Sequence, residues 1–220
     1  MPAYNEENGL AKSVDSAISA ANSAGLDFEI IIVNDGSIDK TGTIAAEISI
    51  KNTSIITIHN EKNMGMGGAF KEGLKNASLS HVMIFAADSE HSADGVLPIL
   101  NLFGKFDMVI PYVKNPEVRP LHRQIISICY TWVLNILFLQ KIPYYNGLVL
   151  YRTELLQSIN IKSNSFSFQA EAILKLLKKR ATWQPVGCFL QKGEHQKTKA
   201  FRIKNIIGVI GTLLRLRISL

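Results

Sequence analysis

The sequence predicts an α/β fold in which a doubly wound, mostly parallel sheet is flanked by helices. Short apolar runs of strand length alternate with segments of helical periodicity through the first half of the chain. The run FEIIIVN at 28–34 is apolar almost throughout, which is typical of a strand buried on both faces of a parallel sheet. In such sheets, ligands bind at the carboxyl ends of the strands, and polar segments follow the strands of this chain.

The elements of the first half follow in a regular order. Leu10, Val14 and Ile18 recur at helical spacing and predict the first helix. Strands are expected at 28–34, 54–60, 81–86 and 106–112, with helices at 41–50, 67–77 and 95–103 between them.

The start of the chain departs from this order. The opening MPAYNEENGL is typical of a loop that follows a strand, yet no strand precedes it. The first strand of a doubly wound sheet is usually central, so a fold without it would have a gap or exposed strand edges. We therefore expect a first strand that is missing or truncated, and a natural protein that begins upstream or in which Met1 replaces a deleted segment.

The second half has a different pattern. A loop punctuated by prolines at 115–120 precedes a long apolar helix at 121–140, and an amphipathic helix is expected at 168–180 before an extended segment at 182–191. The tail at 201–218 places isoleucine and leucine on one helical stripe, beside lysine and arginine, and predicts a basic amphipathic helix.

Composition narrows the classes of protein. The 220 residues are 47% hydrophobic and 19% charged, which indicates a globular chain. A formal net charge of +6 suits nucleic acid, phosphorylated ligands or an acidic membrane surface. Nucleic acid is disfavoured, because the basic residues gather beside apolar helices without aromatic residues for stacking. The longest uncharged run, 124–140, is shorter than the roughly 20 residues of a membrane span and predicts a buried or interfacial helix. Cys129 and Cys188 are expected to be reduced core thiols.

Four polar segments would leave the carboxyl ends of the first four strands. Each is weak by itself: NDGS is a common turn, and a glycine-rich turn before a helix can present backbone N–H groups to phosphate. An apolar strand that ends in acidic residues often marks a site for a divalent cation. The four segments are PAYNEE (2–7), NDGSIDKTG (34–42), NEKNMGMGGA (60–69) and AADSEH (86–91).

Taken together, these segments resemble the family 2 glycosyltransferases, which have the GT-A fold. The nearest branch is similar to the dolichyl-phosphate mannose synthases and the bacterial polyprenyl-phosphate sugar transferases. The resemblance continues through YYNGLVLYR and FSFQAEAILKLLKK in the second half, in the family's order. It implies one catalytic domain with a nucleotide-sugar-binding half at 1–112 and an acceptor-binding half at 113–220.

The resemblance also implies roles for particular residues. The donor would be a UDP- or GDP-sugar, and Asp35 would hydrogen-bond its base. Asp88 matches the last acid of the family's D-x-D motif, the usual metal ligand, whereas Ala86 stands where the family often has aspartate. The implied nucleotide-binding residues are Pro2, Ala3, Tyr4, Glu6, Asp35, Asn63 and Gly65.

The acidic segment predicts a site for Mg²⁺ or Mn²⁺. Mg²⁺ is commonly held by one or two carboxylates together with substrate phosphates, so Asp88 and a donor diphosphate could suffice. Glu90 would share a face with Asp88 in an extended segment and could replace the charge lost at Ala86. The alternative is that Asp88 caps the helix that begins near Ser92, with the neighbouring acids solvated.

The acceptor decides which other residues are needed. A sugar hydroxyl requires a general base, for which Glu171 is the candidate in the second half, whereas a polyprenyl phosphate is already anionic. Glu171 could instead be a solvated acid or order the acceptor loop. Arg123, with Arg119 at the start of the apolar helix, suits recognition of phosphate.

The predicted function is that of an inverting, metal-dependent hexosyltransferase that moves a sugar from a nucleotide sugar to a polyprenyl phosphate. The enzyme would be cytoplasmic and peripheral on the cytoplasmic face of an anionic membrane, attached through 121–140 and the tail. Two alternatives stay open: transfer to a cell-surface polysaccharide or lipopolysaccharide, and a degenerate protein that only binds nucleotide sugars.

Overall fold

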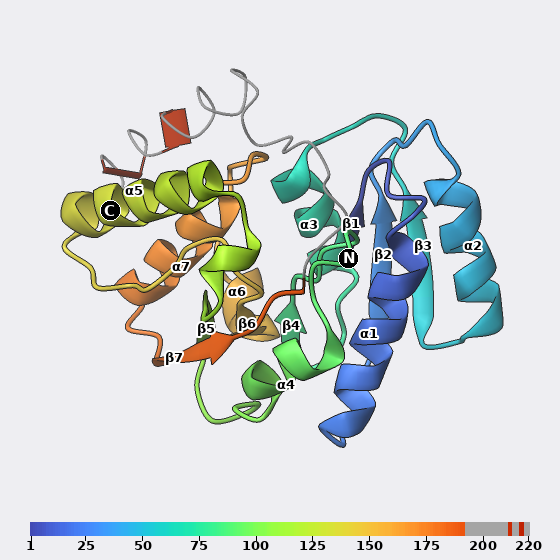
Figure 1. Cartoon of the computed structure of the whole chain (residues 1–220), viewed down its shortest axis with the longest axis horizontal. Helices are drawn as coiled ribbons and strands as arrows, with labels where there is room; N and C mark the ends of the chain where they lie inside the picture. The colour runs from blue at the N-terminus through green and yellow to red at the C-terminus, as the bar shows by residue number, and fades with distance from the viewer. Residues whose placement is uncertain (192–210, 213–215, 218–220) are drawn as a thin grey trace.

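The structure is a computed structural model that describes residues 1–191, 211–212 and 216–217 (Figure 1). Its strands are β1 (Pro2–Ala3), β2 (Ile30–Asn34), β3 (Ile55–His59), β4 (His81–Met83), β5 (Met108–Val113), β6 (Leu150–Arg152) and β7 (Trp183–Cys188). Its helices are α1 (Leu10–Ser23), α2 (Thr41–Lys51), α3 (Met66–Lys75), α4 (Ala93–Leu100), α5 (Leu121–Phe138), α6 (Thr153–Gln157) and α7 (Phe168–Lys178), with a 3₁₀ helix at Pro116–Val118.

The strands form two sheets. One is parallel, in the order β1-β2-β3, and the other has the order β4-β6-β5-β7. In the second sheet β7 is parallel to β5, whereas β6 is antiparallel to both β4 and β5. Helices α1 and α2 lie beside β2 and β3 in Figure 1, and α5 and α7 lie with β5 to β7. This arrangement confirms the predicted α/β fold with a mostly parallel sheet and flanking helices.

The first strand, β1, has two residues. It pairs in parallel with β2, with Pro2 opposite Val33 and Ala3 opposite Asn34. Because β1 leads directly into Tyr4 to Glu6, it still places this loop at the carboxyl end of the sheet, next to Asp35.

Two elements were not expected from the sequence. Strand β6 has three residues and α6 has five, which is too short for a periodic pattern to emerge. Pairing with both β4 and β5 defines β6, and this contact between distant segments leaves no local signal. The first helix begins at Leu10 with Gly9 at its cap position, and Asn5 ahead of it has φ of 54°.

The long apolar helix α5 lies on the surface. Within it only Leu134 is fully buried, and Leu121, Ile128 and Trp132 are each about two-thirds exposed. The helix is therefore not buried, and its attachment to a membrane interface stays a prediction. Cys129 on this helix is exposed, so it is not the core thiol that we expected, whereas Cys188 is buried.

Asn135 explains the polar interruption in this apolar segment. Its side-chain oxygen accepts hydrogen bonds from the backbone N–H of Ile142 and from the Tyr145 hydroxyl, and its amide donates to the Ile142 carbonyl. These bonds turn the chain back after α5, where Leu139 is left-handed with φ of 53°. Among the described residues, no helix combines the length and the apolar character that crossing a membrane requires.

Candidate active site

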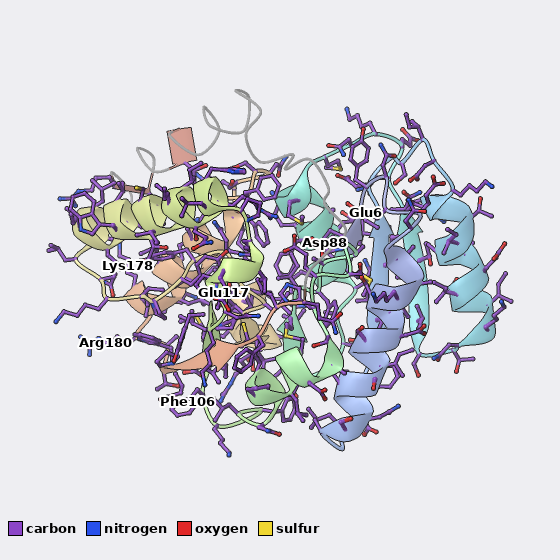
Figure 2. The ribbon with its side chains drawn as sticks, viewed as in Figure 1. Glu6, Asp88, Phe106, Glu117, Lys178 and Arg180 are labelled. Atoms are coloured by element: carbon purple, nitrogen blue, oxygen red, sulfur yellow. The ribbon has the colours of Figure 1, made fainter. Side chains whose placement is uncertain are left out.

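A cleft of about 540 Å³ lies at the carboxyl ends of the parallel strands. Figure 2 shows Glu6 and Asp88 in the central region of the molecule, near the amino terminus. Residues 162–166 form part of the lining, so both predicted halves of the chain contribute to the cleft. The lining includes every residue predicted to bind the nucleotide: Pro2, Ala3, Tyr4, Glu6, Asp35, Asn63 and Gly65.

Asp35 organises the loop between β3 and α3. One oxygen of its buried carboxylate accepts hydrogen bonds from the Asn60 side chain and the Met64 backbone N–H, and the other accepts from the Gly65 N–H. A carboxylate has about four acceptor sites, so these three bonds leave capacity for one further donor. The predicted bond from Asp35 to a nucleotide base is compatible with this geometry and stays a prediction.

The glycine-rich turn packs against the 162–166 loop. Gly65 has φ of 80°, and a Cβ there would lie 2.6 Å from the Asn164 carbonyl oxygen. At Gly67 a Cβ would lie 2.6 Å from the Ser163 carbonyl oxygen, and the Gly67 N–H donates to Asn164. The glycines therefore allow a close approach of backbones. The N–H groups of Gly65 and Gly67 already have acceptors within the protein, so they differ from the phosphate-facing amides that a glycine-rich turn suggests.

Asp88 lies in the wall of the cleft. Burial, together with the negative charge of Glu90, raises the pKa of its carboxyl group to about 6. One of its oxygens accepts a hydrogen bond from the Glu90 backbone N–H. The helix cap at α4 is Ser92, whose hydroxyl accepts from the Gly95 N–H, so the alternative role of Asp88 as that cap is excluded.

The environment of Asp88 suits a divalent cation. Its raised pKa means that nearby positive charge does not compensate its anionic form, and a bound cation would supply that charge. Among the described residues, no three His, Cys, Asp or Glu side chains gather as a metal site. Mg²⁺ is commonly held by one carboxylate together with phosphates and water, so the predicted metal role of Asp88 is compatible with this geometry and stays a prediction.

Glu90 is engaged by two arginines. Its oxygens lie 3.0 Å from Arg119 Nη2 and 3.1 Å from Arg123 Nη1. Burial alone would raise the pKa of Glu90, but the two guanidinium groups hold it below its usual value. Each carboxylate oxygen of Glu90 is thus paired with a guanidinium group. This pairing competes with the predicted role of Glu90 as a metal ligand, and it excludes the alternative in which Glu90 is solvated.

The same arginines line a second cavity, which we call the α5 groove. Its volume is about 520 Å³, and its walls include Arg119, Arg123, Tyr144, Ile128 and Trp132. Arg123 lies in the first turn of α5, and Trp132 lies nine residues further along, roughly 14 Å away by helical rise. The groove therefore has arginines near the start of α5. Further along, its α5 wall combines the apolar Ile128 and Trp132 with polar residues, which are Gln124, Ser127, Thr131 and Asn135.

Glu171 is fully buried beneath the 162–166 loop. It accepts hydrogen bonds from the backbone N–H groups of Lys162 and Ser163, at 3.0 and 2.8 Å, and its Oε1 lies 2.6 Å from Lys175 Nζ. Although burial would raise the pKa of Glu171, these bonds hold it below its usual value. The alternative in which Glu171 is a solvated acid is excluded. The geometry agrees with the other alternative given above, in which Glu171 orders the acceptor loop, here the loop at 162–166.

Sequence reasoning missed several residues of the cleft. The loop 162–166 lines the cleft, yet its sequence KSNSF has no pattern beyond a polar turn. Gly9 and Ser13 of the first helix support the acidic segment: a Cβ at Gly9 would lie 2.5 Å from the Ala87 carbonyl oxygen, and Ser13 accepts from the Ser89 N–H. The predicted basic tail lies almost entirely outside the described residues.

The sequence matches a class of proteins that transfer sugars. The sequence profile of Glycosyl transferase family 2 matches residues 1–159. The chain belongs to this family.

Two curated relatives illustrate the range of the family. A poly-beta-1,6-N-acetyl-D-glucosamine synthase from Staphylococcus epidermidis is 33% identical over 116 residues, which is 53% of this chain and 27% of the relative. A dolichyl-phosphate beta-glucosyltransferase from Trichomonas vaginalis is 30% identical over 99 residues, 43% of this chain and 29% of the relative. The matched segments therefore span less than a third of either relative.

Solved structures agree with the fold. Glucosyl-3-phosphoglycerate synthase from Mycobacterium tuberculosis, in complex with UDP, has a TM-score of 0.70 and 18% identity, covering 98% of this chain and 78% of that one. The same enzyme in complex with Mn²⁺, UDP-glucose and phosphoglyceric acid has a TM-score of 0.69 and 18% identity, covering 98% and 77%. Both comparisons place the chain in the GT-A fold.

Proposed function

We propose that this protein is an inverting, metal-dependent glycosyltransferase that moves a sugar from a nucleotide-sugar donor to a polyprenyl phosphate. The observation that supports this most directly is the position of Glu90. It links the acidic segment of the cleft, through Arg119 and Arg123, to the α5 groove. A donor in the cleft and an anionic, apolar acceptor in the groove would therefore meet near Asp88.

The cleft supplies the donor site. Asp35 and the loop that it organises would bind the nucleotide, and Asp88 would hold a Mg²⁺ or Mn²⁺ ion against the diphosphate. When bound, such a cation neutralises the negative charge that develops on the leaving diphosphate. The relatives with UDP and Mn²⁺ in their structures support this assignment of the site.

The α5 groove supplies the acceptor site. Arginine side chains recognise phosphate through paired N–H groups, and an isoprenoid chain would lie along the apolar residues of the helix. Among the described residues, the lining of this groove contains no aspartate, glutamate or histidine that could act as a general base. This composition favours a phosphate acceptor, which needs no base, over a sugar hydroxyl.

The reaction balances without a proton acceptor. A phosphate oxygen of the lipid attacks the anomeric carbon from the face opposite the nucleoside diphosphate. The bond between the anomeric carbon and the diphosphate oxygen breaks, and the pair of electrons leaves with the nucleoside diphosphate. The products are an inverted sugar phosphodiester and the free nucleoside diphosphate. Within this scheme Arg123 positions the nucleophile, and Glu171 positions the loop opposite the donor.

The exposed face of α5 supports attachment to a membrane. Leu121, Ile125, Ile128, Trp132 and Ile136 recur three or four residues apart, so they form one apolar stripe on the helix, and all are substantially exposed. An interfacial helix of this kind binds membranes through its apolar face, and nearby arginines add attraction to anionic lipids. We propose that the protein is peripheral on the cytoplasmic face, where the lipid phosphate would enter the groove directly.

Transfer to a cell-surface polysaccharide is the second candidate, because the chain is similar to the polysaccharide synthase of Staphylococcus epidermidis. It would require a base for a sugar hydroxyl. Glu171 is the predicted base, but both of its oxygens already accept backbone hydrogen bonds.

A transfer assay tests the proposal. UDP- and GDP-sugars would be incubated with a short-chain polyprenyl phosphate and Mg²⁺ or Mn²⁺, with the matching polyprenol as control. We expect a product from the phosphate alone, labile to mild acid, and its loss in Asp88→Ala. Equal transfer to the polyprenol, or equal activity of Asp88→Ala with and without chelator, would contradict the proposal.

A further inference from the structure

The loop at 162–166 lines the cleft and is tied firmly to α7. The backbone N–H groups of Lys162 and Ser163 donate to the two oxygens of the buried Glu171 carboxylate, at 3.0 and 2.8 Å. The hydroxyl of Ser163 also lies 3.0 Å from the hydroxyl of Ser167, at the start of α7. The loop has no helix or strand of its own, so these bonds fix the path of its backbone.

The same loop is also tied to α3. The Gly67 N–H donates to the Asn164 carbonyl oxygen at 3.0 Å, and Lys71 Nζ lies 2.6 Å from the side-chain oxygen of Asn164. The loop is therefore held by two helices that come from different halves of the chain. A side chain on a loop that is anchored in this way starts from a fixed position, which lowers the entropic cost of binding a ligand.

Lys162 carries the only positive charge among the described residues that line the cleft. The same lining has three carboxylates, which belong to Glu6, Asp35 and Asp88. Lys162 is exposed, and its ammonium group forms no hydrogen bond or ion pair with another described residue. Its charge is thus available to a ligand in the cleft.

The donor of the proposed reaction would bring negative charge into this cleft. Its diphosphate, esterified at both ends, carries two negative charges, whereas Asp88 with a divalent cation has one net positive charge. The charge of Lys162 would balance the remainder. When the sugar leaves, the nucleoside diphosphate gains a third negative charge, so a fixed ammonium group nearby stabilises the transition state more than the bound donor.

We propose that Lys162 contacts the diphosphate of the nucleotide-sugar donor and stabilises the charge that develops on it as the sugar is transferred. This inference rests on the proposed function, because it assigns one further residue to the donor site of that reaction. The ammonium group gives up no proton. The electron pair of the broken bond stays on the diphosphate oxygen, and Lys162 offsets its charge. Glu171 would act indirectly, by holding the backbone of Lys162.

Replacing Lys162 with methionine removes the charge and keeps an unbranched side chain. The fold should tolerate this change, because the bond from Lys162 to Glu171 comes from the backbone N–H and the lysine side chain is exposed. Lys162→Arg keeps the positive charge. Lys105→Met is the matched control, since Lys105 is also exposed but lies outside the lining of the cleft.

Calorimetric titration with UDP, UDP-glucose and uridine, with Mn²⁺ at low ionic strength, measures the contact without transfer. We expect Lys162→Met to weaken UDP binding roughly tenfold, UDP-glucose binding less and uridine binding not at all, because these ligands carry three, two and no negative charges on phosphate. Lys162→Arg and Lys105→Met should bind UDP within about threefold of the natural protein. GDP, GDP-mannose and guanosine would replace these ligands if the natural protein binds GDP in place of UDP.

Several outcomes would overturn the inference. One is an equal affinity of Lys162→Met and the natural protein for UDP. Another is an equal loss for UDP and uridine, which would indicate a displaced loop, and a third is a larger loss for UDP-glucose than for UDP, which would place Lys162 on the sugar. A natural protein that binds neither UDP nor GDP would overturn the proposed function, and this inference with it, before any variant is compared.

Discussion

Replacing Glu171 with glutamine tests how the cleft is held in shape. The side chains have nearly the same size, but glutamine removes the negative charge and one of the two acceptor oxygens. In the structure these oxygens accept from Lys162 and Ser163, and one also pairs with Lys175. The variant therefore leaves one buried backbone N–H without an acceptor. It also removes the carboxylate partner of the Lys175 ammonium group, which is 19% exposed and keeps its hydrogen bond to the Asn160 carbonyl.

The magnitude follows from these losses. Breaking a fully buried ion pair by removing one partner costs about 3–5 kcal/mol. Because Lys175 is partly exposed and keeps its bond to Asn160, we expect a smaller cost of about 2–3 kcal/mol. For a domain of this size each kcal/mol lowers the Tm by about 2–4 °C, so we expect a decrease of roughly 5–10 °C. Glu72 provides a matched control: it pairs with Lys75 within α3, but that lysine side chain is 69% exposed. We expect Glu72→Gln to cost at most about 1 kcal/mol.

The loss of stability in Glu171→Gln should depend on pH, in the direction set by the pKa of Glu171. The pKa of Glu171 is lowered in the folded protein, so its stabilising contribution is present above the pKa of the unfolded chain and is lost as the pH falls through the folded pKa. The difference in Tm between the natural protein and Glu171→Gln should therefore be full at pH 7. It should shrink below the usual glutamate pKa of about 4.3.

Calorimetry of both variants between pH 3.5 and pH 7.5 measures this difference, and steady-state kinetics adds a second readout. Because Glu171 supports a loop that lines the cleft, we expect a higher KM for the donor sugar. A Glu171→Gln variant as stable as Glu72→Gln would refute the reasoning. So would normal stability and KM with a large loss of kcat, which is the behaviour of a catalytic base.

Three further predictions concern the cleft and the groove. Because Asp88 has a pKa of about 6 without metal, the affinity for Mn²⁺ in the presence of UDP should fall about tenfold per pH unit below that value. Calorimetric titration that gives equal affinities at pH 7.5 and pH 5 would contradict this prediction. Arg123→Met should raise the KM for a polyprenyl phosphate at least roughly tenfold, because a charged hydrogen bond is lost, while the KM for the donor stays within about twofold. Equal changes in the two KM values would instead show a general structural effect. Trp132→Glu on α5 should reduce cosedimentation with anionic liposomes, whereas Ile38→Glu, also at an exposed apolar residue, should not; an equal loss in both variants would exclude α5 as the attachment site.

The arrangement of the donor site could be predicted from sequence because parallel strands impose it. Each polar segment follows an apolar strand, and the carboxyl ends of parallel strands meet at one edge of the sheet. The strand pattern therefore predicted that the four polar segments meet, and the family resemblance implied the individual residues. Tyr4, Asp35, Asn63 and Asp88 do line one cleft, although they are far apart in the chain. The lengths of most helices and strands followed from periodicity in the same way.

Partners of charged side chains depend on contacts that periodicity does not encode. The sequence by itself determined the α/β architecture through the order and spacing of local patterns. The resemblance of its motifs to a known family implied the family and the residues around the cleft. Only the tertiary structure decided that Glu90 pairs with Arg119 and Arg123, and that Glu171 is buried against a loop. It also decided that a cavity lies between β2 and β4. Each of these depends on how distant segments pack, and a side chain of the same type could equally be solvated in another fold.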